Sequence, residues 1–227
     1  PGSGDPDRRK ATRDVARSGD IRRRTSDRLT GMSTHDVAAD PVAVDPEPAD
    51  LAELSDHVAS SAAQFVSAVE VVAGAESPDE VVSILLLELS SLLAAGAPLG
   101  AIEDVVPDER FEPDAGPEPD IDRLRTRLHE LLGPVDDYVE VFDPYAQPEL
   151  VAARLSDDLS QITSDLLHGL AHQAAGRRLE ALWWWQFSYL ATWGPAASAA
   201  LRALQSLVAH VRLEVPLEAD PEADDLT

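Results

Sequence analysis

The sequence predicts an all-α fold, a single helical bundle of about five or six helices with disordered tails at both ends. Leucine, valine and isoleucine recur three or four positions apart in several segments, as they do on the buried face of a helix. Glycine and proline separate these segments. Alternation typical of a strand occurs only once, so no second run is evident to complete a sheet. We expect the helical domain over residues 49–214, between a tail and linker at 1–48 and an acidic tail at 215–227.

The first 48 residues are expected to contribute nothing to the fold. Residues 1–31 are rich in Arg, Asp, Gly and Ser and hold few large apolar side chains, a composition typical of disorder. The one methionine of the chain is Met32, and we expect translation to begin there, with residues 1–31 upstream of the true start. A basic arm that contacts nucleic acid is the alternative. From Met32 to Pro48, acids and three prolines predict a linker.

Start and stop signals place the first three helices. The pattern DLAE has the form of a capping box and predicts a helix over 50–74, which a glycine ends. The pattern SPDE predicts a second helix over 77–95, with a serine cap, a proline in the first turn and a glutamate at the reciprocal position. Prolines alternate with acids over 105–119, which predicts a long loop. A third helix is expected over 121–132, before a Gly-Pro stop.

The second half of the chain is predicted to supply the remaining helices. Residues 138–142 alternate like a strand, and because no partner strand is evident we interpret them as an extended connector. The run 149–175 is predicted to be helical, with an interruption near Ser156. A tryptophan-rich helix over 179–193 follows, and the last helix is expected over 195–213. The inward face of this last helix is expected to carry Leu201, Leu204, Val208 and Val211.

The tryptophan-rich helix holds all four tryptophans of the chain and is expected to lie at the centre of the bundle. A helical wheel predicts an inward face of Leu179, Leu182, Trp183, Gln186, Leu190 and Trp193. Trp183 and Trp193 are therefore expected to be buried anchors, and Gln186 is expected to find buried partners such as indole N–H groups. Trp184 lies on the opposite side, where either another helix covers it or it contacts a partner. Trp184 and Trp185 are our candidates for contact with a protein partner.

The charge of the chain excludes several classes of partner. The formal net charge is -24, and nine of the 18 basic residues lie in the first 31 residues. Such an acidic body repels the backbone of nucleic acids and anionic lipid, so we expect no direct nucleic-acid or membrane binding by it. The absence of cysteine excludes disulfides and thiolate chemistry. We find no apolar run of about 18 residues and no secretory signal, so a cytoplasmic location is expected.

Two groups of residues are candidates for metal binding, although solvated acids and ordinary helix-end histidines are the simpler explanation of both. Asp157, Asp158 and Asp165 lie near one helix face, where carboxylates can hold Mg²⁺ or Mn²⁺. Asp165, His168 and His172 form the pattern D-x2-H-x3-H, whose two histidines can reach one zinc ion. No catalytic set, phosphate-binding glycine loop or dinucleotide fingerprint is present, so neither a catalytic residue nor a cofactor is expected.

The connector VFDPY, the helix LSDDLSQITSDLLHGL and the helix ALWWWQFSYLATWG follow one another in this order. Together they resemble the bacterial family called domain of unknown function 5063, over roughly residues 51–213. The resemblance implies a helical fold and no assigned activity. Relatives carry a polar residue in place of Trp184, a basic one in place of Gln186, and histidines near Thr192 and Ala196. The resemblance therefore transfers no catalytic or metal role to these positions.

Helix signals without catalytic motifs, together with surplus aromatic surface, favour a non-enzymatic protein-binding or adaptor module. The alternative is a metal-dependent hydrolase of nucleotides that uses the carboxylate face described above. A mimic of DNA, which would place its acids in a basic groove of a DNA-binding protein, is a third hypothesis. The sequence does not identify the protein partner or the oligomeric state.

Overall fold

The computed structural model describes residues 48–107, 112–117, 119–141, 145, 147 and 149–214. Within this part of the chain there are six α-helices, which confirms the predicted all-α class, and a small sheet that was not predicted. The helices are α2 (Pro48–Val72), α3 (Pro78–Gly96), α4 (Asp122–Leu132), α5 (Leu155–Ala174), α6 (Arg178–Ala191) and α7 (Trp193–Arg212), and the shorter elements are the 3-10 helices η1 (Ala97–Gly100) and η2 (Gly133–Val135) and the strands β1 (Asp137–Val141) and β2 (Leu150–Arg154). The tails expected at 1–48 and 215–227 lie outside the described residues apart from Pro48, and so does Met32.

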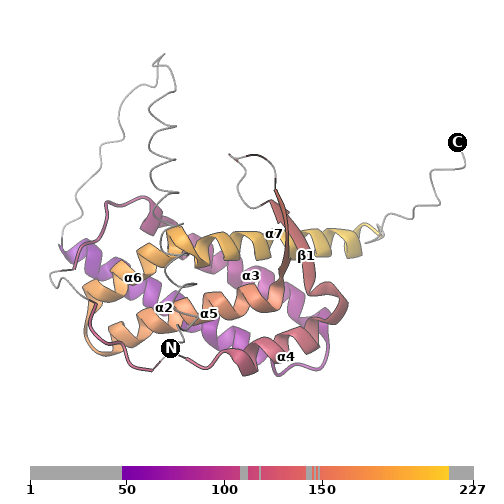
Figure 1. Cartoon of the computed structure of the whole chain (residues 1–227), viewed down its shortest axis with the longest axis horizontal. Coiled ribbons are helices and arrows are strands. Elements are labelled where there is room, and N and C mark those ends of the chain that lie inside the picture. The colour runs from indigo at the N-terminus through magenta and orange to yellow at the C-terminus, as the bar shows by residue number, and fades with distance from the viewer. Residues whose placement is uncertain are drawn as a thin grey trace, which may run out of the picture. The chain divides into compact units, whose positions relative to one another are not determined.

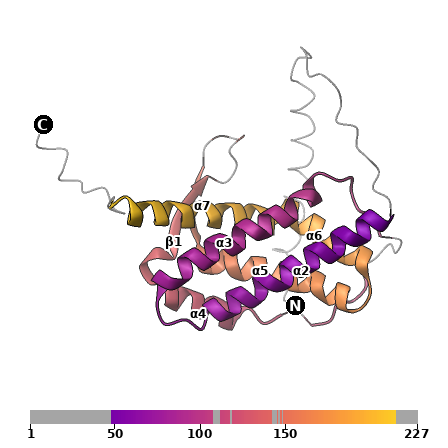
Figure 2. The same ribbon diagram turned by 180° about the vertical axis from the view of Figure 1, so that it is seen from behind.

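Helix α5 lies at the centre of the bundle and contacts α2, α4, α6 and α7. Helix α3 packs against α2 and α7. In Figure 1, α5 lies between α4 and α7, with α2 and α3 behind it, and Figure 2 brings those two helices to the front. The leucines of α5 and α3 form much of the core between these layers, namely Leu159, Leu166, Leu85, Leu89 and Leu92.

Two glycines allow large aromatic rings to reach the core. Trp185 lies directly against the backbone of α5 at Gly169, where a Cβ atom would overlap its indole ring. Trp193 lies in the same way against Gly96 at the end of α3. Both indoles are completely buried, and the N–H of Trp185 donates to the carbonyl of Leu166 at 3.4 Å. The close approach of α5 and α6 therefore depends on the absence of a side chain at Gly169.

The predicted inward face of α6 was rotated from the real one. Trp193, Leu182 and Gln186 are buried as predicted, but Trp183 is only partly buried and Leu190 is 59% exposed. The side chains that fill the interior instead are Ala181, Trp185 and Ser188. A helical wheel predicts the inward face from the side on which apolar residues of one helix gather. It contains no information on the space that Gly169 leaves on the neighbouring helix for Trp185.

The single residue Thr192 separates α6 from α7. Helix α7 begins at Trp193, two positions before its predicted start at 195. Pro195 is tolerated because it lies in the first turn of α7, where its missing N–H would have no helical partner. Leu204 is buried as predicted, but Val211 is 70% exposed, so its predicted inward position is wrong. The end of α7 extends past the other helices that the structure describes, as Figure 1 shows.

The predicted connector is a strand. β1 pairs in antiparallel fashion with β2, with Asp137 opposite Arg154 and Val141 opposite Leu150. The helix expected over 149–175 therefore begins only at Leu155. The sequence LVAAR of β2 holds two alanines and an arginine, which favour a helix when judged locally, and pairing with β1 overrides that preference.

Asp136, at the other end of the hairpin, provides the cap that begins α5. Its buried carboxylate accepts hydrogen bonds from the backbone N–H of Ser156 at 2.8 Å and from the Ser156 hydroxyl at 2.7 Å. The residue at the cap position itself, Arg154, makes no capping bond with its side chain. A cap supplied from 20 residues away is invisible to any local start signal.

Helix α3 begins as predicted, with Pro78 in its first turn. Ser77 has the extended backbone of a cap residue but makes no capping hydrogen bond with its side chain, so that part of the prediction is wrong.

Within the described residues, the segment Val81–Gly100 is long and apolar enough to cross a membrane, contrary to the sequence expectation. It contains one glutamate and three serines, but its leucines keep the mean hydropathy of the segment high. Its Leu85, Leu89 and Leu92 are buried in the bundle.

Candidate functional site

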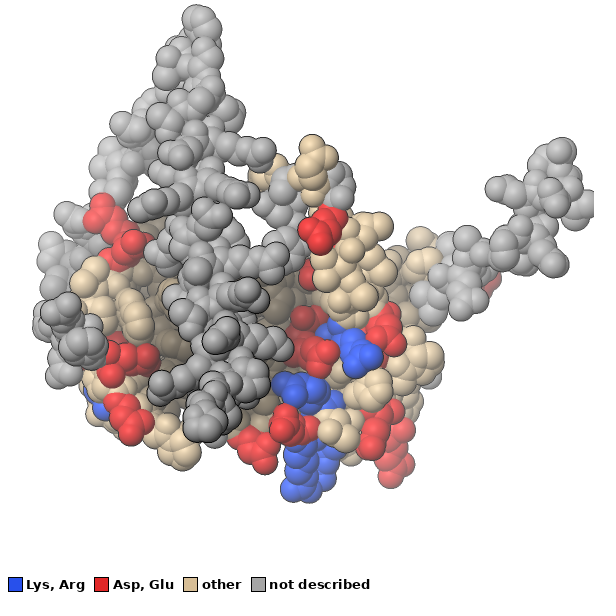
Figure 3. Space-filling model, in the orientation of Figure 1, with Lys and Arg blue, Asp and Glu red and all other residues tan. Residues whose placement is uncertain are grey.

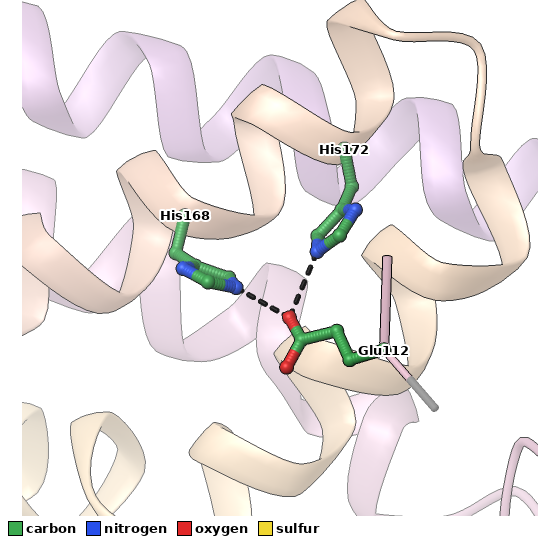
Figure 4. Close-up of side chains that lie close together, drawn as sticks. All are labelled: Glu112, His168 and His172. Carbon is green, nitrogen blue, oxygen red and sulfur yellow. Dashed lines mark hydrogen bonds and ion pairs between the residues drawn. The ribbon is translucent and has the colours of Figure 1, made fainter. Parts of the chain in front are cut away.

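Two histidines of α5 and one glutamate of a distant loop meet at one point. His168 and His172 are four positions apart on α5, so they lie on the same face one turn apart. Glu112 belongs to the proline-rich segment between η1 and α4. Figure 4 shows both imidazole rings directed at the Glu112 carboxylate.

The distances within this cluster are short. The Nε2 atom of His168 lies 2.5 Å from Oε1 of Glu112, and the Nε2 atom of His172 lies 2.9 Å from the same oxygen. The three atoms that could bind an ion all lie within 4.8 Å of one another. Among the described residues no other group of His, Asp or Glu side chains satisfies this geometry.

The cluster is buried on one side and open on the other. The side chain of His172 is 0% exposed, while those of His168 and Glu112 are 25% and 30% exposed. Burial opposes ionisation of Glu112, but hydrogen bonds from His168 and His172 and their positive charge outweigh it, so the pKa of this carboxyl lies below its ordinary value. The Nδ1 atom of His172 is buried without a hydrogen-bond partner, so Nε2 is the nitrogen through which this ring meets another polar group.

Neighbouring side chains fix the cluster in position. The indole of Trp184 lies against the His168 ring with 4.0 Å between ring centres, and its N–H donates to the carbonyl of Asp165 at 2.9 Å. Arg177 donates from Nη2 to the carbonyl of Asp114 at 2.9 Å, which holds the loop near the end of α5. The His168 ring and the loop that carries Glu112 are thus restrained by contacts outside the cluster, and His172 is held by its burial.

The structure does not bring Asp157, Asp158 and Asp165 to one point. Asp157 pairs with Arg125 at 3.3 Å, and Asp158 accepts a hydrogen bond from the Tyr138 hydroxyl at 2.7 Å. Asp165 accepts hydrogen bonds from Thr192 at 2.6 Å and from Gln161 at 3.1 Å. These carboxylates do not form a group that could hold an ion in the described part of the chain.

The half-buried Asp158 and the buried Asp165 both have raised pKa values. Burial raises the pKa of Asp158 to about 6, against the effect of the Tyr138 hydrogen bond and with help from the charges of Glu140, Asp157 and Asp136. Burial also raises the pKa of Asp165, although Thr192, Gln161 and His168 oppose the shift.

The two partner candidates from the sequence differ in accessibility. Trp185 is completely buried and offers no surface to a partner. Trp184 is partly buried, and the helix that covers it is α5, through His168 and Asp165.

The side chain of Gln186 has buried hydrogen-bond partners, as expected, but these are backbone groups and not the indole N–H groups. Its carbonyl accepts the backbone N–H of Val105 at 2.7 Å, and its amide donates to the carbonyls of Leu99 and Glu103, each at 3.0 Å.

A groove of about 920 Å³ lies between β1 and α7. One wall consists of all five residues of β1 together with Pro134, Val135 and Leu155, and the other consists of residues of α7 from Pro195 to His210. In Figure 1 the β1 ribbon crosses the middle of α7. The sequence does not reveal this groove, because residues 138–142 have no evident partner strand and are interpreted as a connector.

Comparisons with known proteins identify a family and a fold. The family model described as Domain of unknown function (DUF5063) matches residues 49–210. The chain is similar to the crystal structure of protein BF1032 from Bacteroides fragilis, with 19% sequence identity and a TM-score of 0.55 over 74% of this chain and 93% of that one. No curated protein matches the chain. At this identity the structural likeness supports the fold and carries no function.

Proposed function

The chain belongs to the family described as Domain of unknown function (DUF5063), and we propose that it is a non-enzymatic protein-binding module that holds an extended segment of a partner protein between β1 and α7. The groove between these two elements is the observation that carries the proposal. The alternative, a metal-dependent hydrolase of nucleotides that uses Asp157, Asp158 and Asp165, has no converging carboxylates to support it.

The outer edge of β1 faces the groove. Side chains alternate between the two faces of a strand, so a groove lined by five consecutive residues meets the strand at its edge. The N–H of Leu155 donates to the carbonyl of Asp136 at 2.9 Å, which marks a hydrogen-bonded pair at the end of the ladder. Because such pairs alternate along an antiparallel ladder, residues 137, 139 and 141 direct their N–H and C=O groups away from β2. These groups match the backbone of an added strand.

The α7 wall leaves room for a second backbone. Five of its lining residues are small or compact, namely Pro195, Ser198, Ala199, Ala203 and Ser206, and the larger ones are Arg202, Leu207 and His210. Val139 and Val141, on the opposite wall, are 64% and 45% exposed. We therefore infer a partner segment that is extended and carries apolar side chains at alternate positions.

The charge of the protein supports a protein partner over a nucleic acid. Figure 3 shows acidic side chains spread over one face, with basic ones gathered mainly over the region of α4. A net charge of -24 opposes the approach of a phosphate backbone.

A random library of displayed peptides, selected on the full chain, tests the proposal. We expect selection of extended apolar peptides, and we expect two variants to weaken binding of a selected peptide at least about tenfold. Ala203→Trp fills the groove, and Val139→Pro removes an N–H from the outer edge of β1.

Matched controls separate the groove from general damage. Ala209→Trp adds the same ring at an exposed position of α7 outside the groove, and Ala152→Pro removes an N–H from the outer edge of β2. Both should retain peptide binding within about twofold. If the selection yields no peptide, or if Ala203→Trp and Val139→Pro bind the peptide as the controls do, the groove is not the binding surface.

A further inference from the structure

We propose that Glu112, His168 and His172 bind one Zn²⁺ ion, which links the proline-rich loop before α4 to the central helix α5. The two histidines lie on one face of α5, and the glutamate reaches them from 56 positions upstream of His168. This site is separate from the groove between β1 and α7, because none of its three residues lines that groove.

The cluster has to adjust on both sides to accept an ion. Zinc lies about 2.0–2.2 Å from imidazole nitrogen and carboxylate oxygen, so two ligands at a tetrahedral angle are about 3.3 Å apart. The present separations of 2.5 and 2.9 Å between the nitrogens and Oε1 are shorter than this, whereas the two nitrogens lie within 4.8 Å of each other. On binding, Glu112 retreats by about half an ångström, and the partly exposed His168 ring adjusts to bring its nitrogen within ligand distance of that of His172.

The ligand types select the class of ion. Two imidazole nitrogens and one carboxylate oxygen suit zinc and its first-row neighbours, whereas Mg²⁺ and Ca²⁺ prefer oxygen ligands alone. Three protein ligands leave a fourth tetrahedral position open to water. The partly exposed side of the cluster, formed by Glu112 and His168, gives solvent and the ion access to that position.

The ligands are held in place before an ion arrives. His172 is completely buried, the His168 ring lies on the indole of Trp184, and Arg177 holds the neighbouring loop residue Asp114 through its carbonyl. Side chains restrained in this way lose little freedom on binding, which favours a site of defined geometry.

Titration calorimetry on the full chain, stripped of metal with a chelator and dialysed, tests the site. We expect ZnCl₂ to bind at one site per chain and both Glu112→Gln and His168→Gln to weaken binding by more than about 100-fold, beyond the loss seen when an outer-shell partner of a ligand is removed. Two controls change an acid and a histidine elsewhere. Asp120→Asn alters an exposed acid of the segment before α4, His57→Gln alters an exposed histidine of α2, and both should bind within about threefold of the wild type.

A second measurement separates this site from adventitious binding by surface acids. Cobalt in place of zinc should give the intense visible d–d band of a four-coordinate ion in the wild type and lose it in Glu112→Gln. Thermal melts without metal should shift by no more than a few degrees in Glu112→Gln, because the amide oxygen can still accept the hydrogen bonds of the two histidines and the side chain is partly exposed. Failure of the wild type to bind zinc, or binding that survives both substitutions, overturns the proposal.

Discussion

Asp158 is a half-buried carboxyl near the start of α5 whose burial makes stability depend on pH. Its pKa rises from 3.8 to about 6, and burial is the main cause. The pKa of Asp158 is higher in the folded state than in the unfolded state. Between pH 4 and pH 6, on the order of these two pKa values, the folded state therefore keeps a proton that the unfolded state has lost. The contribution of Asp158 to stability therefore falls as pH rises from about 4 to about 6, and the loss is complete above that range.

Asp158→Asn should remove this loss. The asparagine amide oxygen can still accept the hydrogen bond of the Tyr138 hydroxyl, but it carries no charge. We expect the variant to exceed the wild type in free energy of unfolding by about 1 kcal/mol at pH 7, a figure reduced for partial exposure, and to match it near pH 4. Urea denaturation at the two pH values measures the difference. The exposed Asp157→Asn is the control, and a difference that is equal at both pH values would exclude ionisation as the cause.

At the scale of a residue, the sequence identified only part of the candidate metal site. His168 and His172 were recognisable because their spacing places them on one helix face. Glu112 was not, because the loop it belongs to holds many acids among its prolines and no local signal distinguishes one of them. Its role depends on where the loop lies over α5, which is a property of the tertiary fold.

At the scale of an element, α5 depends on a cap from outside itself. Asp136→Ala should leave the N–H and hydroxyl of Ser156 without their buried partner. We expect a loss of about 2–3 kcal/mol in the free energy of unfolding, since a helix cap and a buried hydrogen bond disappear together. Chemical denaturation measures the loss.

The neighbouring acid provides the comparison for this prediction. Asp137 is 71% exposed and pairs with the exposed Arg154 at 3.0 Å, so Asp137→Ala should cost less than about 1 kcal/mol. Equal losses in the two variants would show that the hairpin as a whole, and not the Asp136 cap, holds the start of α5.

The elements that the sequence predicted correctly are those with local signals. Pro78 and the glycines at 74 and 133 mark helix ends that the structure places within a few residues. The hairpin and the start of α5 were missed, because strand pairing across residues 142–149 and a cap at Asp136 are both non-local. The phase of α6 was missed for a related reason, since Gly169 on another helix decides which tryptophan is buried.

At the scale of the whole molecule, the described core and the family match both fall within residues 48–214. The melting temperature of a chain limited to these residues should therefore lie within a few degrees of that of the full chain, which is the shift that about 1 kcal/mol represents. Calorimetry of the truncated and full chains compares the two melting temperatures. A drop well beyond that range would show that a terminal segment contributes to the stability of the fold.

The long-range packing of α2 has a consequence during synthesis. Its Ser55 donates hydrogen bonds to Gln173 and to the carbonyl of Arg178, which follow it by 118 and 123 positions. At about 5–20 residues per second, the ribosome needs on the order of ten seconds to produce these partners. Until then α2 and α3 can pair only with each other, with the apolar surfaces that α5, α6 and α7 will cover still facing water. The nascent chain thus passes through an interval in which it depends on chaperones or on low local concentration to avoid aggregation.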